Sequence, residues 1–374
     1  MWAILVKEFR QLRRDRRTVA MLLMLPFLFL VIFGYAASFD VKDVRTIVVG
    51  PMAAPAAALL PERMDVIGIY PSRDEAFARD ALKDGDAVVA VVTPASGADA
   101  VGETRILVDG SELFAARAAV TMFAQLQPSA DATLAAQLPA PEILFNPELK
   151  TSVIMVPGLC GIILVFVGTV ATALGVVRER QAGTLEQLAV MPFKPRDVFV
   201  GKIGPYLLIA TIDMIVIVVV GMLLFGVPFA GSVATFALGA GLFLFVTLGI
   251  GVLVSTVSQT QGQAIQLAMM TMLPQFLLSG LFFPLYSMPW GVRWIGYCLP
   301  LTWFVKVARG VMVRGTPIEA LWLPLVVLAL MATIVFTLSV LRFRRDLAPA
   351  APGDTGSDDL ESTGEVAVTV GAQV

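Results

Sequence analysis

Long apolar runs alternate with shorter polar segments along most of this chain. Each apolar run has about 20 residues, the length at which an α-helix crosses a hydrocarbon layer of ~30 Å. The runs cover residues 18–38, 152–177, 203–225, 233–257, 263–283 and 320–341. This pattern predicts an α-helical polytopic membrane protein with six transmembrane helices, whose even number places both chain ends on one side of the membrane.

The first apolar run follows a basic segment, residues 1–17, in which Trp2, Leu5 and Phe9 recur at helical spacing. This spacing predicts an amphipathic helix on the inner membrane face, although the basic residues could serve only to orient the chain. The small residues 36–38 also resemble a signal-peptide cleavage site. The run is long for a signal peptide, and we therefore expect an uncleaved anchor.

A soluble-looking domain is expected at residues 39–151, between the first two apolar runs. Four segments have the composition of β-strands: Arg45–Gly50, Val66–Tyr70, Ala87–Thr93 and Thr104–Val108. Nine Lys and Arg residues stand against sixteen Asp and Glu residues in this domain. An acidic domain that follows a basic segment and one membrane span is expected on the outer side.

Helices are expected between these strands, which makes the inserted domain an α/β domain. Ser72 and Glu75 have the spacing of a capping box, which predicts a helix that continues to Lys83. The turn Asp109–Gly110 precedes a second expected helix at 111–127. No pair of nucleophile and base stands out, so the domain is expected to bind or dock rather than to catalyse.

The composition agrees with a membrane protein. The chain has 374 residues, of which 57% are hydrophobic and 15% charged, and its mean hydropathy is +0.82. It contains no histidine, and its net charge is −2. We therefore expect no bound metal and no nucleic-acid partner. Fourteen Lys and Arg residues fall in the segments predicted to lie inside, which supports cytoplasmic N- and C-termini.

The most polar of the internal loops covers residues 178–202. Its residues 183–191 predict a short helix. Thr184 can cap this helix, Leu185 contributes to an apolar side, and Pro192 ends it. A short helix between two membrane spans is suited to receiving force from a soluble partner. The chain has no G-x-x-x-x-G-K-[ST] phosphate loop, so any ATPase that drives it is expected to be a separate chain.

Aromatic and basic residues are interleaved in residues 284–318, a segment that Pro289 and Pro300 interrupt. The segment predicts one or two short helices at the outer interface or dipping into it. The alternative is an aromatic belt that only anchors the fold. The tail, residues 347–374, is acidic and rich in small residues, which is typical of disorder.

Asp213 is the single acidic residue within a predicted span. Burying a carboxylate at mid-helix costs about 2.5–3.5 kcal/mol on insertion scales, so Asp213 is a candidate functional residue. It could equally accept hydrogen bonds at a subunit interface. A proton relay would require a partner, and no second charge lies within the predicted spans.

Several of these segments resemble the permease subunits of type-2 ATP-binding-cassette (ABC) exporters, in particular the bacterial multidrug-type group with a large external domain. Residues 178–188 are similar to that family's E-x-x-x-G-T segment, with Glu179, Gly183 and Thr184 in place. Further similar stretches are 191–202, 278–289 with 299–300 and 308–310, and 106–111. The resemblance covers most of residues 1–346.

The resemblance implies a role for each unusual segment. Segment 1–17 and the 178–202 loop would contact a cytoplasmic ATPase, and 152–346 would form a five-helix membrane domain. The implied coupling residues are Arg178, Glu179, Gly183, Thr184, Leu185, Glu186, Leu188, Pro192 and Pro195. The 284–318 segment would form two re-entrant helices. Its marked residues are Pro284, Pro289, Trp290, Pro300, Arg309 and Gly310.

The resemblance also implies partners and a location. The chain would lie in the bacterial inner membrane with a second permease subunit, identical or paralogous, and with ATPase subunits that use ATP and Mg²⁺. It would bind no cofactor itself. Members of this group often work with a periplasmic adaptor and an outer-membrane channel, which become further candidate partners. The apolar walls suit drugs or other hydrophobic compounds, although related permeases move lipids and polymers.

Two other functions remain open from the residues alone. A membrane receptor or mechanotransmitter would use the external domain to sense, and no substrate would cross. A proton-coupled carrier would use Asp213 and would work without any ATPase. Six spans and a re-entrant segment favour a transport pathway over signalling.

Overall fold

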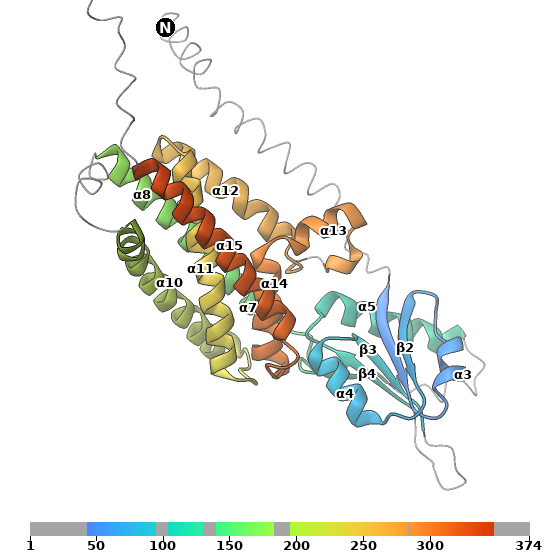
Figure 1. The fold of residues 1–374 in the computed structure, drawn as a ribbon. Coiled ribbons are helices and arrows are strands. Elements are labelled where there is room, and N and C mark those ends of the chain that lie inside the picture. Colours follow the sequence, from blue (N-terminus) through green and yellow to red (C-terminus); the bar gives the residue numbers. More distant parts are fainter. Residues whose placement is uncertain (1–42, 95–103, 130–139, 183–194, 283, 348–374) are drawn as a thin grey trace, which may run out of the picture.

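A computed structural model describes residues 43–94, 104–129, 140–182, 195–282 and 284–347 of the chain. It has an α/β domain at one end of a bundle of long helices (Figure 1). The segments expected at 1–17, 18–38 and 183–191 lie outside the described residues, as does the tail after Leu347.

The α/β domain contains a five-stranded mixed sheet. Its strands are β1 (Val44–Val49), β2 (Met64–Tyr70), β3 (Val89–Val92), β4 (Arg105–Asp109) and β5 (Glu142–Leu144). The order is β2-β1-β3-β4-β5; β1 is parallel to β2 and β3, whereas β4 is antiparallel to β3 and parallel to β5. All four expected strands are present, and β5 is a short edge strand that was not expected.

Helices cover both faces of this sheet, which explains why β1 buries side chains on both of its faces without alternation. The helices are α3 (Ala53–Ala58), α4 (Glu75–Asp84) and α5 (Leu113–Ser129). Val44 and Val48 of β1 belong to one buried cluster with Ala119 of α5, whereas Ile47 belongs to another with Leu82 of α4. Successive residues of one strand therefore contribute to two separate cores.

The expected capping box at Ser72 and Glu75 is wrong. Asp74 is the N-cap of α4, and its carboxylate accepts a hydrogen bond from the backbone N–H of Phe77 at 3.2 Å. An aspartate at the N-cap satisfies an N–H group that has no partner within the helix, so the helix begins one residue after it. Glu75 instead forms an ion pair with Arg79.

Within the described residues, four helical segments are long and apolar enough to cross a membrane, as expected of a polytopic membrane protein. They are Thr151–Gln181, Gly204–Phe225, Val233–Val257 and Trp322–Arg342. The first comprises α7 (Thr151–Phe166), the π-helix η1 (Val167–Ala171) and α8 (Thr172–Gln181). The other three lie in α10 (Pro195–Phe225), α11 (Val233–Val257) and α15 (Trp322–Leu347).

The predicted count of six spans stays a prediction. The expected span at 263–283 corresponds in place to α12 (Gln261–Leu278), which is not among these four segments. Glutamines such as Gln263, Gln266 and Gln275 interrupt its apolar sequence and lower its hydropathy. α12 nevertheless packs against α7, α8 and α11, so it is part of the bundle.

Helix α11 is the central helix of the described bundle and packs against α8, α10, α14 and α15. Its apolar window is 61% buried, whereas that of α10 is 17% buried. Close approach to η1 depends on Gly251, because a Cβ atom there would lie 2.8 Å from the carbonyl oxygen of Thr169. The small residues of α11 thus allow helices to meet backbone to backbone.

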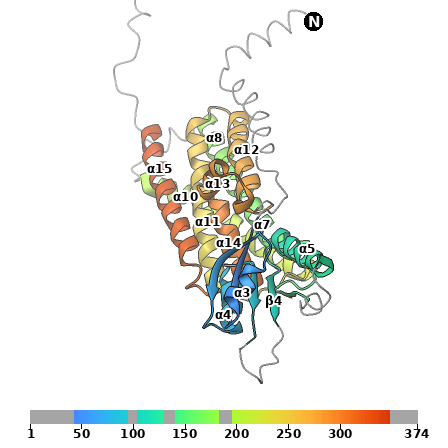
Figure 2. The same ribbon diagram turned by 90° about the vertical axis from the view of Figure 1, so that its right-hand side faces the viewer.

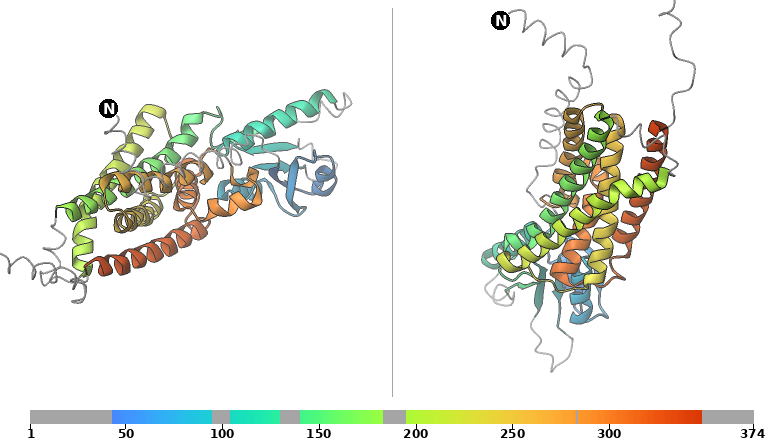
Figure 3. Two further views of the ribbon diagram at one scale, coloured as in Figure 1. Left: turned by 90° about the horizontal axis from the view of Figure 1, so that it is seen from above. Right: turned by 90° about the vertical axis from the view of Figure 1, so that its left-hand side faces the viewer.

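The segment after α12 forms two short α-helices, a 3₁₀-helix and a π-helix. They are η2 (Leu285–Ser287), α13 (Trp290–Tyr297), α14 (Pro300–Arg309) and the π-helix η3 (Gly310–Arg314). α14 packs against α7, α11 and α15, whereas α13 exposes Trp290 and Trp294. Figures 1 and 2 show where the two helices lie. This segment and the α/β domain lie towards the same end of the bundle (Figure 3).

Candidate functional site

The predicted coupling segment is described only at its two edges. Arg178 and Glu179 lie in the last turn of α8, where Arg178 is exposed and Glu179 is half-buried, and Pro195 is the first residue of α10. The remaining coupling residues lie outside the described residues: Gly183, Thr184, Leu185, Glu186, Leu188 and Pro192. Their role as coupling residues stays a prediction.

Arg180 attaches the edge of this segment to the end of α11. Its Nη1 atom donates hydrogen bonds to the carbonyl oxygens of Ser255 at 3.0 Å and Ser258 at 3.1 Å. Ser255 lies in the last turn of α11 and Ser258 is its C-cap, so the positive guanidinium lies at the negative end of the helix dipole. The adjacent Gln181 accepts a hydrogen bond from Gln261 at 3.0 Å. The end of α8 is thereby joined to the α11–α12 turn.

Asp213 is half-buried on α10, close to strongly exposed apolar side chains such as Ile212 and Ile215. Within the part of the chain that the structure describes, its carboxylate forms no ion pair. The role of Asp213, including a part in a proton relay, stays a prediction.

Arg309 fixes the predicted re-entrant segment to the bundle. It is 7% exposed, and its guanidinium donates to three carbonyl oxygens: Leu281 at 2.8 Å, Gly280 at 3.4 Å and Ile154 at 3.4 Å. These carbonyls belong to α7 and to the turn that follows α12. A buried cation held by carbonyls joins three elements that are far apart in sequence.

The other marked residues of this segment occupy three different settings. Pro300 is the first residue of α14, a position that suits its missing N–H, and Gly310 begins η3. Trp290 is 75% exposed and begins α13, and the exposed Pro289 is the N-cap of this helix. Among the marked residues, the fold brings Pro284 and Arg309 together at one cavity.

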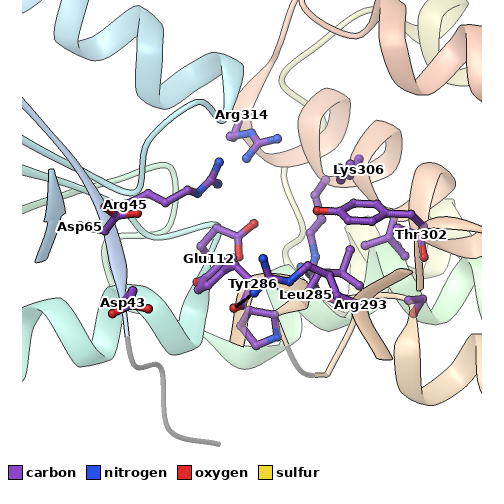
Figure 4. A pocket seen from close by; sticks show the side chains of 16 residues that line it. Asp43, Arg45, Asp65, Glu112, Leu285, Tyr286, Arg293, Thr302, Lys306 and Arg314 are labelled. Carbon is purple, nitrogen blue, oxygen red and sulfur yellow. Dashed lines mark hydrogen bonds between the residues drawn. The ribbon is translucent and has the colours of Figure 1, made fainter. Parts of the chain in front are cut away.

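This cavity lies between the α/β domain and the segment from α12 to η3 and has a volume of about 400 Å³. Figure 4 shows its wall, to which β1 contributes Arg45, η2 contributes Tyr286 and α14 contributes Lys306. Five cationic side chains line it: Arg45, Arg293, Lys306, Arg309 and Arg314. Three acidic side chains also line it: Asp43, Asp65 and Glu112.

The acidic and cationic side chains of the cavity differ in exposure. Asp43 and Asp65 are exposed, whereas Arg309 is buried and the Arg314 side chain is 8% exposed. Solvent screens exposed charges much more than buried ones. Glu112 is half-buried and Arg314 is paired with Asp109, so these two acids offset part of the positive charge, and the remaining cations outnumber Glu112. The cavity volume lies within the range of about 300–1,000 Å³ that is common for ligand sites.

An ion pair closes one side of the cavity. Arg314 Nη1 lies 3.5 Å from Asp109 Oδ2, and the other carboxylate oxygen accepts a hydrogen bond from the backbone N–H of Ser111 at 2.8 Å. Burial raises the pKa of Asp109 above its ordinary value, and the charge of Arg314 partly opposes this shift. The pair links β4 of the α/β domain to η3 of the bundle.

Most of the cavity residues escaped sequence reasoning. The interleaved aromatic and basic pattern at 284–318 marked the neighbourhood of Arg293, Lys306 and Arg314 without assigning them a role. Arg45 belongs to an expected β-strand that lies some 240 residues earlier in the chain. Only the tertiary fold brings Arg45 to the same space.

Comparison with known proteins gives one matching family over most of the chain. The family described as "ABC-2 family transporter protein" matches residues 16–341. "Probable multidrug ABC transporter permease YbhS" of Escherichia coli (strain K12) is 28% identical over 367 residues, which cover 92% of this chain and 97% of that protein. "Probable multidrug ABC transporter permease YbhR" of the same strain is 24% identical over a stretch that covers 92% of this chain and 98% of that protein. "Inner membrane transport permease YhhJ" is 34% identical over a stretch that covers 55% of this chain and 56% of that protein.

Proposed function

Because this chain belongs to the ABC-2 family of transporter proteins, we propose that it is the membrane-spanning permease subunit of an ATP-driven exporter. It contributes the pathway and no catalytic residues, and a separate ATPase chain binds ATP and Mg²⁺. The substrates are drugs or other hydrophobic compounds, as the names of the multidrug permease relatives suggest. The match across residues 16–341 is the observation that carries this proposal.

Force from the ATPase enters through residues 178–202. The attachment of Arg180 to the carbonyls of Ser255 and Ser258 supports this assignment, because it joins α8 to the α11–α12 turn. A displacement of the α8 end is then shared by three helices of the bundle. Three helices joined in this way are suited to moving together between two packed arrangements. In the transport cycle, these arrangements would open the pathway to one side of the membrane and then to the other.

The proposed assembly has two permease subunits and two cytoplasmic ATPase subunits in the bacterial inner membrane. The N- and C-termini are cytoplasmic, and six spans cross the membrane. The α/β domain, inserted between the first and second spans, lies outside the cytoplasm. There it offers a docking surface to a periplasmic adaptor that leads to an outer-membrane channel.

Co-purification tests the partner assignment. The intact chain and a variant with residues 183–191 replaced by a Gly/Ser linker are purified in mild detergent, and the accompanying chains are identified by mass spectrometry. We expect an ABC ATPase with the intact chain and its loss from the variant. ATPase stimulation by substrate in reconstituted vesicles then separates an exporter from a receptor that moves nothing.

The opposite outcome is equally informative. If neither preparation contains an ATPase, the permease proposal fails. Transport that a pH gradient drives without any ATPase, and that Asp213→Asn abolishes, would instead indicate a proton-coupled carrier.

A further inference from the structure

The cavity between the α/β domain and the 284–314 segment contains hydrogen-bond donors that have nothing to donate to. Five of the described residues that line it have a buried side-chain atom without a hydrogen-bond partner: Arg45 Nε, Ser279 Oγ, Tyr286 Oη, Arg293 Nε and Arg314 Nε. Ser279 is 2% exposed, and the Arg314 side chain is 8% exposed. Buried polar groups are normally paired, so a cluster of unpaired donors at one cavity indicates a missing acceptor.

The three guanidinium groups are already held in place through their other nitrogens. Arg45 Nη2 donates to the carbonyl oxygen of Gly85 at 3.2 Å, and Arg293 Nη2 donates to that of Met288 at 3.2 Å. Arg314 Nη1 lies 3.5 Å from Asp109 Oδ2. Each guanidinium therefore keeps its Nε–H unpaired in a fixed position, and little freedom is lost when a ligand binds.

We propose that this cavity binds a phosphate group. A phosphate carries negative charge and several acceptor oxygens, whereas a carboxylate has two oxygens and would satisfy fewer of these donors. Guanidinium groups pair well with phosphate because their N–H groups match its oxygens. Three acids also line the cavity: Asp43 and Asp65 are exposed, so solvent screens their repulsion of the ligand, whereas the half-buried Glu112 opposes the ligand and is outnumbered by the five cations.

The surroundings of the cavity suit a phosphate that belongs to a lipid headgroup. Leu285 and Val305 add apolar surface to its wall. The neighbouring helix α13 exposes Trp290, Trp294 and Ile295, and exposed tryptophans favour the boundary between lipid and water. A free phosphate compound would use the same donors, and the two sources are separated by experiment.

The test measures binding to the full chain after purification in detergent and removal of lipid. Native mass spectrometry compares phosphatidylglycerol with diacylglycerol of the same acyl chains, and calorimetry measures inorganic phosphate and glycerol 3-phosphate. We expect phosphatidylglycerol to bind and diacylglycerol not to bind. Arg45→Gln and Arg293→Gln should each weaken binding about tenfold, since each removes one charge-assisted contact.

Matched variants keep the test decisive. Arg73→Gln changes an arginine of the same domain that stacks on Phe77, outside the cavity, and should leave binding unchanged. Tyr286→Phe removes a single unpaired hydroxyl without altering charge and should weaken binding a few-fold. Thermal melting confirms that each variant is folded.

The outcomes are distinct. Binding of soluble phosphate compounds without the lipid would keep the phosphate site and change its source. Equal binding of diacylglycerol and phosphatidylglycerol, no binding of any phosphate-bearing probe, or full binding in folded Arg45→Gln and Arg293→Gln chains would overturn the proposal. None of these results bears on whether an ATPase drives the chain, so this proposal and the exporter proposal fail independently.

Discussion

Arg314 and Asp109 form an ion pair where the α/β domain meets the helical bundle. Their side chains are 8% and 0% exposed, although more than 200 residues separate them in sequence. Beside the pair, the hydroxyl of Thr316 donates to the carbonyl oxygen of Lys83 at 2.6 Å. The junction is therefore held by polar contacts between η3, with the residues that follow it, and the sheet domain.

Removing one partner of this pair should destabilise the chain strongly. We expect Arg314→Gln to lower the free energy of unfolding by about 3–5 kcal/mol, because it leaves a buried carboxylate without its counter-charge. Thermal melting in detergent measures the change. Glu148→Gln is the matched control, since the Lys150–Glu148 pair is 56% and 71% exposed. Removing this exposed pair should lower the free energy of unfolding by at most about 1 kcal/mol. An equal loss of stability in the two variants would contradict the argument.

Asp109 should also make stability depend on pH. Burial raises the pKa of its carboxyl, so between the ordinary and the raised value the folded chain holds a proton that the unfolded chain has released. The free energy of unfolding should therefore fall as the pH rises through this window. Melting temperatures of the wild type and Asp109→Asn over a pH series measure the effect, which the variant should lack. Arg314→Gln should extend the window upward, because Arg314 lowers this pKa.

Gly251 and Gly241 of α11 make a matched pair for packing. A Cβ atom at position 251 would lie 2.8 Å from the carbonyl oxygen of Thr169, whereas position 241 has nothing within 4 Å. Gly251→Ala should cost about 1–3 kcal/mol, because backbone must shift to admit the methyl group. Gly241→Ala should be neutral or stabilise by up to about 1 kcal/mol through helix propensity. Thermal melting of the two variants measures both effects, and a similar response would argue against the close contact with η1.

Arg180 should be required for coupling rather than for assembly. Arg180→Ala removes the hydrogen bonds to Ser255 and Ser258 while leaving residues 183–202 unchanged. We expect an ATPase to co-purify as before but substrate stimulation of its activity to fall at least several-fold. Wild-type stimulation in a well-folded Arg180→Ala complex would show that force does not pass through this contact.

Glu179 and Gly183 test the segment itself. Glu179→Ala or Gly183→Leu should leave the subunit folded and weaken coupling to the ATPase, since both positions match the E-x-x-x-G-T segment of the permeases. Transport by reconstituted complexes is the measurement, with size-exclusion profiles as the check on folding. Unchanged transport in either variant would count against the role of this segment.

Short sequence patterns predicted the secondary-structure elements that neighbouring residues determine. The apolar strands and long apolar helices are present because short apolar runs bounded by turns and ~20-residue apolar runs each favour one kind of element. The N-cap of α4 was assigned wrongly because Ser72 and Asp74 are both good caps and only the backbone selects Asp74. β5 was missed because three residues carry too little pattern.

The cavity is the part that sequence could not supply. Arg309 was marked through resemblance, yet its three carbonyl partners come from two elements that no spacing rule connects to it. Arg45 lies in a strand whose apolar residues predict that its neighbours are buried, and this pattern does not indicate where the Arg45 side chain lies. Sites of this kind arise from the docking of domains, and a single sequence holds no signal for which arginines will meet.

The π-helix η1, at Val167–Ala171, gives the first long helix a rotational offset. An additional residue within one turn advances every later side chain by about 100° around the helix axis. The α7 part of this helix packs mainly against α14 and α10, whereas the α8 part packs mainly against α11 and α12. Deleting one residue between 167 and 171 would rotate α8 relative to α7 and turn Arg180 away from the carbonyls of α11, which breaks the connection while preserving every side chain that makes it.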